Sequence, residues 1–230
     1  MDVYRGFPGP SWRLGALLGV CAALAFVLTA AGKANAAGWK PYFLVATSDL
    51  NDPIFARSVI LMLPPPAPPN PIIAGLIINK PTAIPLSRLF PKAAAVKDQT
   101  AYFGGPVRLN EASMLIRGSM PPGKTTHLLD GIYLSTDPKS ITSAIGSARS
   151  LNNVRLFLGR AQWTRDQLHH EIMEGAWYIS PPNAAMVFSS NPGSIWRTLV
   201  RRAQLLKVDA PAPDQSHIFG LLWAPGRLPQ

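Results

Sequence analysis

An α+β domain with a mixed β-sheet is the fold class that this sequence predicts. Pairs of apolar runs separated by turn residues occupy the first half of the chain, and strand-length runs alternate with amphipathic helical patterns in the second half. The 230 residues are 47% hydrophobic, which is enough to bury a core in one large domain or two small ones. The stretch before residue 40 has a different composition and is treated separately.

Residues 1–36 have the pattern of an export signal. Arg5 and Arg13 precede the uncharged run Leu14–Ala31, and Ala34–Ala36 supplies the small residues that a signal peptidase needs. The run has 18 residues, so an uncleaved N-terminal membrane anchor is the other interpretation. Both interpretations place the remaining chain outside the cytoplasm. We expect a periplasmic domain, or one anchored in the inner membrane and facing the periplasm; a cytoplasmic location is the alternative.

Two strands open the folded part of the chain. Apolar and small residues dominate Tyr42–Leu63, and the polar turn Ser48–Pro53 separates a first strand from a second at about Ser58–Leu63. The proline-rich stretch Pro64–Pro71 lacks backbone donors, so we expect a stiff exposed connector, with docking to an aromatic groove of a partner as the alternative. The apolar run Ile72–Ile78 predicts a strand buried on both faces.

Shorter elements are predicted in the middle of the chain. Pro81 is expected to end the preceding strand, because proline cannot donate to a β-ladder. A short helix is expected around Leu86–Phe90. Apolar residues alternate along Ala112–Arg117 as in a half-buried strand, and Ile132–Leu134 predicts another strand.

Helices alternate with strands in the second half. Asp137 can cap and Pro138 can open a helix. Its apolar residues share one stripe: Ile141, Ala144, Ile145 and Ala148. Val154–Leu158 predicts a strand, and Thr164 with Gln167 predicts a capping box at the start of the next helix.

The last predicted elements are a short strand and a long helix. The helix that follows Thr164 is expected to end near Glu174, before Gly175, and Trp177–Ile179 predicts a strand. The final helix is expected to bury Ile195, Trp196, Leu199, Val200, Ala203 and Leu206. The folded domain is thus expected to span residues 40–207, followed by an irregular tail over residues 208–230.

Residues 118–125 read GSMPPGKT and match the phosphate-loop template. Pro121 and Pro122 remove two backbone donors that such a loop needs. Only four residues separate Thr125 from the turn at Asp130, which leaves no room for the helix that would follow a phosphate loop. The stretch is therefore interpreted as an exposed hairpin loop, not as a nucleotide site.

Other catalytic and metal-binding patterns are missing from the sequence. Cys21 is the single cysteine, so neither a disulfide within the chain nor a thiolate metal site is expected. His170 and Glu174 have the spacing of a helical ion pair. No metal, cofactor or catalytic residue is predicted. The formal charge of +10 is scattered, so nucleic-acid binding is a weaker hypothesis, and it is not expected of an exported protein.

Polar and glycine residues at predicted strand ends form the candidate ligand-binding set, because sites are often built beside turns. The set is Asp52, Arg57, Asn79, Lys80, Gly104 and Gly105. The alternative is structural: Asp52 closes an Asx turn and pairs with Arg57, and the glycines adopt backbone angles that other residues avoid.

Six segments in order resemble the AlgH/YqgE family across residues 42–203. They are YFLVATSDLNDPIFARSVILM, GLIINKPT, YFGGPV, LLDGIYLST, LFLGRAQW and GAWY. The resemblance implies a bifurcated β-sheet folded into a pseudo-barrel with packed helices, in bacterial proteins of largely unassigned molecular function. One branch has been linked to transcriptional regulation of exopolysaccharide production, and no catalytic mechanism comes with the family.

These observations lead to one functional expectation and two alternatives. We expect a non-enzymatic binding or regulatory domain, exported or membrane-tethered, that recognises a protein or a small molecule through the candidate set. One alternative is an enzyme of unknown reaction with a pocket at Asp52, Arg57, Asn79 and Lys80. The other is a cytoplasmic transcriptional regulator, which holds if residues 1–36 are not an export signal.

Overall fold

The computed structural model describes residues 39–66, 72–93, 96, 99–119, 121, 123–148 and 151–209, with the side chains of 206–209 excepted. All of them lie in the larger of two units of the chain, Asn35–Gln230. The predicted leader, most of the predicted tail and most of the proline-rich connector lie outside the described residues. Within the described part, the structure contains no helix with the length and apolar character that a membrane span requires.

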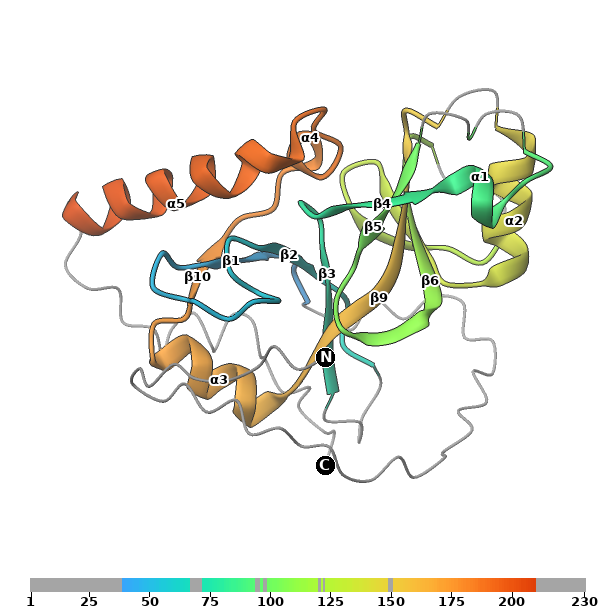
Figure 1. Ribbon diagram of the computed structural model, residues 1–230. Helices are drawn as coiled ribbons and strands as arrows, with labels where there is room; N and C mark the ends of the chain where they lie inside the picture. The colour runs from blue at the N-terminus through green and yellow to red at the C-terminus, as the bar shows by residue number, and fades with distance from the viewer. Residues whose placement is uncertain are drawn as a thin grey trace, which may run out of the picture. The chain divides into compact units, whose positions relative to one another are not determined.

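The described residues form one ten-stranded sheet and several helices, which confirms the α+β class (Figure 1). The strands are β1 (Phe43–Ala46), β2 (Val59–Met62), β3 (Ile72–Ile77), β4 (Pro81–Pro85), β5 (Thr100–Phe103), β6 (Val107–Arg117), β7 (Thr126–Leu129), β8 (Ile132–Ser135), β9 (Val154–Thr164) and β10 (Trp177–Ser180). The helices are α1 (Leu86–Leu89), α2 (Pro138–Ser147), α3 (Arg165–Met173), α4 (Ala184–Val187) and α5 (Pro192–Asp209).

The sheet branches at β9. Its strands follow the order β10-β1-β2-β3-β9-β6-β8-β7, and β4 and β5 leave this path as a side branch. The C-terminal half of β9 pairs with β3, and its N-terminal half pairs with β6 on one side and, in parallel, with β5 on the other. The change of neighbours along one strand produces the bifurcated, curled sheet that the resemblance implied.

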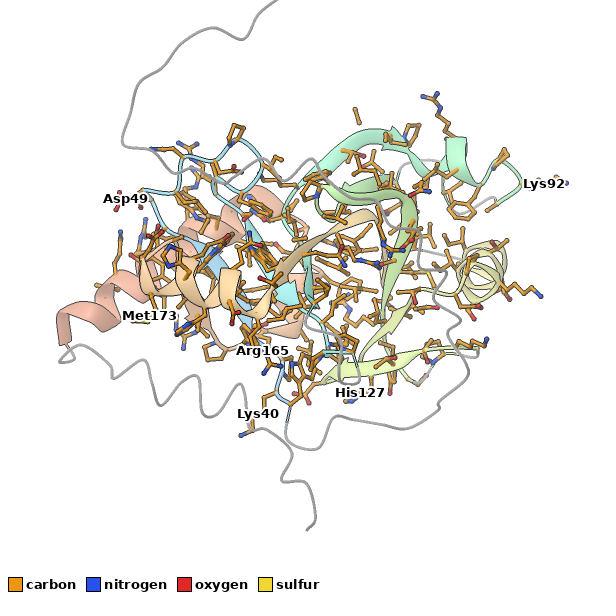
Figure 2. All side chains as sticks on the ribbon, turned by 90° about the horizontal axis from the view of Figure 1, so that it is seen from below. Lys40, Asp49, Lys92, His127, Arg165 and Met173 are labelled. Atoms are coloured by element: carbon orange, nitrogen blue, oxygen red, sulfur yellow. The ribbon has the colours of Figure 1, made fainter. Side chains whose placement is uncertain are left out.

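Helices α5 and α3 cover opposite faces of the part of the sheet formed by β10, β1, β2 and β3 (Figure 1). Side chains alternate between the faces, so that Phe43 packs with the α5 side and Leu44 with the α3 side. Both residues are fully buried, which explains why these short strands lack a polar face. Met173, at the end of α3, is 58% exposed and lies on the surface (Figure 2).

The predicted caps of two helices are confirmed, with one change. The Asp137 carboxylate accepts a hydrogen bond from the Ser140 N–H at 2.9 Å, and the Thr164 hydroxyl accepts one from the Gln167 N–H at 3.2 Å. The Gln167 side chain bonds Glu171 instead of returning to Thr164, so only one half of the predicted capping box forms.

One prediction about turns is confirmed with an addition, and another is wrong. The strand β3 ends at Ile77, before Pro81 as predicted, but Pro81 is itself the first residue of β4, a position where a strand tolerates proline. The stretch 118–125 is not a hairpin loop, because β8 lies between the two strands that it joins, β6 and β7. It leads into a strand instead of a helix, which is consistent with rejecting the phosphate loop.

Candidate functional site

Residues 52–57 form a compact turn between β1 and β2. Asp52 Oδ1 accepts hydrogen bonds from the N–H groups of Ile54 and Phe55, both at 2.8 Å, and its carbonyl accepts one from the Ala56 N–H at 2.7 Å. Asp52 therefore organises the turn, as an Asx turn does. It is not paired with Arg57 among the ion pairs of the described residues, which differs from the structural alternative.

Asn79 anchors the end of this turn from the neighbouring strand. Its Oδ1 accepts a hydrogen bond from the Val59 N–H at 2.8 Å, and its Nδ2 donates to the Arg57 carbonyl at 2.9 Å. Asn79 is only 8% exposed, so the bond to Val59 is shielded from water and the bond to Arg57 is partly shielded. Asn79 thereby fixes the backbone of Arg57, which has a left-handed φ of 56°.

Lys80 completes the turn on its outer side. Its Nζ donates a hydrogen bond to the Ile54 carbonyl. Partial burial lowers the pKa of Lys80, and the negative charge of Asp52 opposes that shift. Asp52, Arg57, Asn79 and Lys80 are thus brought together as the sequence predicted, but three of them serve mainly to hold the turn.

Replacing Asn79 with alanine is expected to loosen this turn. The change leaves the Val59 N–H and the Arg57 carbonyl without partners, which costs about 1–3 kcal/mol of unfolding free energy. Denaturant titration measures the loss, and amide hydrogen exchange should rise in residues 54–58. The exposed Asn110, changed to alanine in parallel, serves as a surface control. Unchanged exchange in the turn would contradict the anchoring role of Asn79.

An aromatic cluster holds the turn against the sheet. Phe55 contacts the rings of Trp163 and Trp177 at centroid distances of 5.7 and 5.8 Å. The indole N–H groups of both tryptophans donate to one oxygen of Glu171, each at 2.9 Å. A single carboxylate on α3 therefore fixes the two rings on which Phe55 rests.

Arg57 points toward the N-terminal part of α5. Its guanidinium lies over the ring of Trp196, 5.7 Å from the centroid, and the Trp196 indole donates to the Ala46 carbonyl at 2.7 Å. Together with Gly193 and Arg197 these two residues line a pocket of about 370 Å³. Of the six candidate residues, Arg57 alone belongs to this lining. Two arginines, Arg57 and Arg197, thus line one pocket. The ion pairs of the described residues include neither of them.

Gly104 and Gly105 lie where β5 crosses β9, not in the lining of this pocket. A Cβ at Gly104 would lie 2.3 Å from the Gly159 carbonyl oxygen, and one at Gly105 would lie 2.1 Å from the Ala161 nitrogen. Gly105 also has a φ of 148°, which side chains disfavour. The described contacts of the glycine pair are those of a close backbone crossing.

Arg155 and Arg117 form a second pair of arginines, and both pack on aromatic rings of the domain. Arg155 lies over the Tyr102 ring at 4.6 Å and donates to the Ser189 carbonyl, and Arg117 lies over Phe188 at 5.0 Å. Burial lowers the pKa of Arg155. Among the described residues, His, Cys, Asp and Glu side chains form no group of three that could hold a metal ion. His170 and Glu174 pair at 3.0 Å, as predicted.

Comparison with known proteins decides the family. The model of a protein family described as AlgH-like matches residues 43–206. The chain belongs to this family. Among its AlgH-like relatives, a UPF0301 protein of Azoarcus sp. (strain BH72) is 32% identical over 174 residues, covering 73% of this chain and 89% of the relative. A UPF0301 protein of Methylococcus capsulatus is 30% identical, with the same two coverages.

Solved structures confirm the AlgH-like fold. The solution structure of the AlgH protein from Pseudomonas aeruginosa has a TM-score of 0.59 and 25% identity, and the match covers 79% of this chain and 98% of that one. A crystal structure from Corynebacterium diphtheriae has a TM-score of 0.56 and 22% identity, covering 75% of this chain and 87% of that one. The predicted pseudo-barrel of the AlgH/YqgE resemblance is therefore correct.

The pocket residues outside the turn were not found from the sequence. Trp196 was assigned to the buried side of the last helix, and Gly193 and Arg197 were not singled out. The pocket joins the turn at Arg57 to a helix about 140 residues later in the chain. No local pattern marks such a contact.

Proposed function

We propose that this AlgH-like chain is a non-enzymatic binding domain, exported or membrane-tethered, that takes a small anionic group in the Arg57 pocket. The observation that supports this best is the lining itself, in which Arg57 and Arg197 flank Trp196. Guanidinium groups bind carboxylates and phosphates through two parallel hydrogen bonds. A pocket of about 370 Å³ is within the range that accommodates small ligands.

The surroundings of Arg57 support a role beyond structure. Arg57 keeps a left-handed backbone conformation that costs a non-glycine residue roughly 1–2 kcal/mol. Its side chain is exposed, and its described contact is with the face of Trp196. A glycine would satisfy the backbone at this position. These features support a binding role for the arginine side chain.

The lining favours binding over catalysis. Arginine, glycine and tryptophan side chains offer neither a nucleophile nor an acid or base that titrates near neutral pH. The groups that could have served an enzyme are used elsewhere, since Asp52 accepts the turn N–H groups and Lys80 donates to Ile54. An enzyme remains the alternative, and turnover that depends on Lys80 would support it.

Arg57→Gly is the substitution that separates binding from stability. Loss of left-handed strain and loss of the Trp196 contact are each worth roughly 1 kcal/mol and oppose one another, so stability should change by less than about 1 kcal/mol. Calorimetric titration with pyrophosphate should show at least about tenfold weaker binding, because one of two charge-assisted contacts is removed.

The matched control is Arg108→Gly. Arg108 is the other non-glycine residue with positive φ among the described residues, at 55°, and it pairs with the exposed Glu111 at 2.6 Å. This variant makes the same change of charge and backbone away from the pocket, so its affinity for pyrophosphate should equal that of the native chain. Equal affinities of the native chain and Arg57→Gly would contradict the proposed site.

The export part of the proposal rests on residues 1–36 and is tested by fractionation. We expect a bacterial host that expresses the full chain to yield either a soluble periplasmic species that begins at Ala37 or a membrane-bound species of full length. Intact-mass analysis distinguishes the two. Full-length protein in the cytosol would refute the export interpretation and restore the cytoplasmic regulatory alternative.

A further inference from the structure

We propose that the exposed face of α5 docks on an anionic membrane surface through lipid phosphate groups. The buried face of α5 is formed by Ile195, Leu199 and Val200. Its exposed face carries Arg197, Arg201 and Arg202. Residues 192–205 contain no aspartate or glutamate, and the ion pairs of the described residues include none of these three arginines.

The spacing places the arginines on one continuous surface. Arg197 and Arg201 are four residues apart, so they lie about 40° apart around the axis and about 6 Å apart along it. Arg202 lies about 100° further round. Leu205 falls between Arg201 and Arg202 in projection and is 62% exposed. Basic side chains around an exposed apolar one are typical of a helix that lies against lipid headgroups.

The rest of the chain favours a membrane as the partner. Eleven residues separate the end of the apolar run Leu14–Ala31 from Phe43, the first residue of β1. Eleven residues span at most about 40 Å when fully extended. If the run is inserted in a bilayer, the domain is held next to the lipid surface, and weak contacts then act at a high effective concentration. Each arginine near an anionic surface contributes about fivefold in affinity.

This inference is tested apart from the Arg57 pocket through Arg201 and Arg202, which lie outside the lining of that pocket, whereas Arg197 belongs to both surfaces. A nucleic acid is the competing polyanion. The α5 face is less suited to it, because the aromatic residue of α5, Trp196, is half-buried and the exposed residues of this face offer no aromatic ring for base stacking. The test therefore includes DNA as a separate arm.

The experiment uses the full chain with Cys21→Ser, so that one new cysteine can be labelled. An environment-sensitive fluorophore is attached at Thr198→Cys on the exposed face of α5 or, as a control, at the exposed Ser143→Cys on α2. Each protein is mixed with phosphatidylcholine vesicles, with or without phosphatidylglycerol. We expect the α5 probe alone to report membrane contact, only with phosphatidylglycerol, and less at high salt.

Charge variants identify the residues responsible. The double variant Arg201→Gln, Arg202→Gln should have about 25-fold lower affinity for vesicles that contain phosphatidylglycerol, as reported by the α5 probe. The corresponding double lysine variant should keep the native affinity. Arg57→Gly should leave it unchanged, which separates this result from the pocket. Equal responses with both lipid mixtures, or no effect of the double glutamine variant, would overturn the proposal. The proposal would also be overturned if the chain bound duplex DNA more tightly than vesicles and the double glutamine variant abolished that DNA binding.

Discussion

Glu171→Ala is expected to lower the free energy of unfolding by about 3–4 kcal/mol. The change leaves two indole N–H groups without their acceptor, on Trp163 and Trp177, which are 2% and 4% exposed. Each unsatisfied buried donor costs about 1–3 kcal/mol. Phe55 rests on both rings, so the turn that carries Arg57 should also become more mobile. Urea denaturation followed by tryptophan fluorescence measures the stability.

Two further variants define the cause of that loss. Glu174→Ala removes a carboxylate of the same helix end, whose pair with the exposed His170 is worth at most about 1 kcal/mol. Glu171→Gln keeps an oxygen acceptor and should lose less stability than the alanine variant. A Glu171→Ala protein as stable as Glu174→Ala would show that the two tryptophans do not depend on this carboxylate.

Gly105→Ala is expected to cost at least about 4 kcal/mol and to prevent accumulation of folded protein. A new Cβ would lie 2.1 Å from the Ala161 nitrogen and 2.2 Å from the Arg160 carbonyl carbon. These are backbone atoms of β9, which cannot move aside as a flexible side chain can. The φ of 148° adds a conformational cost of its own. Soluble yield and circular dichroism measure the outcome.

Gly146→Ala is the matched control for this glycine. Gly146 lies in α2, and a Cβ there would have no heavy atom within 4 Å. Alanine is a better helix former than glycine, so this variant should gain about 0.5–1 kcal/mol. Folded Gly105→Ala with native stability would mean that β5 and β9 do not cross as closely as described.

Periodicity was sufficient to predict the strongly patterned elements. The runs Ile72–Ile78 and Val154–Leu158 contain β3 and the start of β9, whose residues are all buried or half-buried. Asp137 and Thr164 mark helix starts because each accepts a hydrogen bond from the backbone N–H of the third residue after it. The elements that were missed are short, such as β4 with five residues and α4 with four. β4 alternates exposed and half-buried residues and begins and ends with proline, so neither composition nor burial distinguishes it from a loop.

The candidate site was predictable only where it is local. Asp52 and Arg57 share one turn, and Asn79 and Lys80 follow the adjacent strand, so their proximity follows from pairing of β2 with β3. The function of Asn79 as an anchor was not predictable, because its partners are backbone groups about 20 residues away. The same holds for Trp196, whose indole bonds Ala46, 150 residues earlier.

Family membership fixes the fold without fixing the chemistry, so the account depends on what binds at Arg57. The most direct measurement is a pyrophosphate titration of ¹⁵N-labelled full-length protein, followed by NMR. The account predicts saturable shifts that are largest for the Trp196 indole N–H and the backbone N–H groups of Arg57 and Gly193. The absence of shifts, or the largest shifts at Arg117 and Arg155, would contradict it.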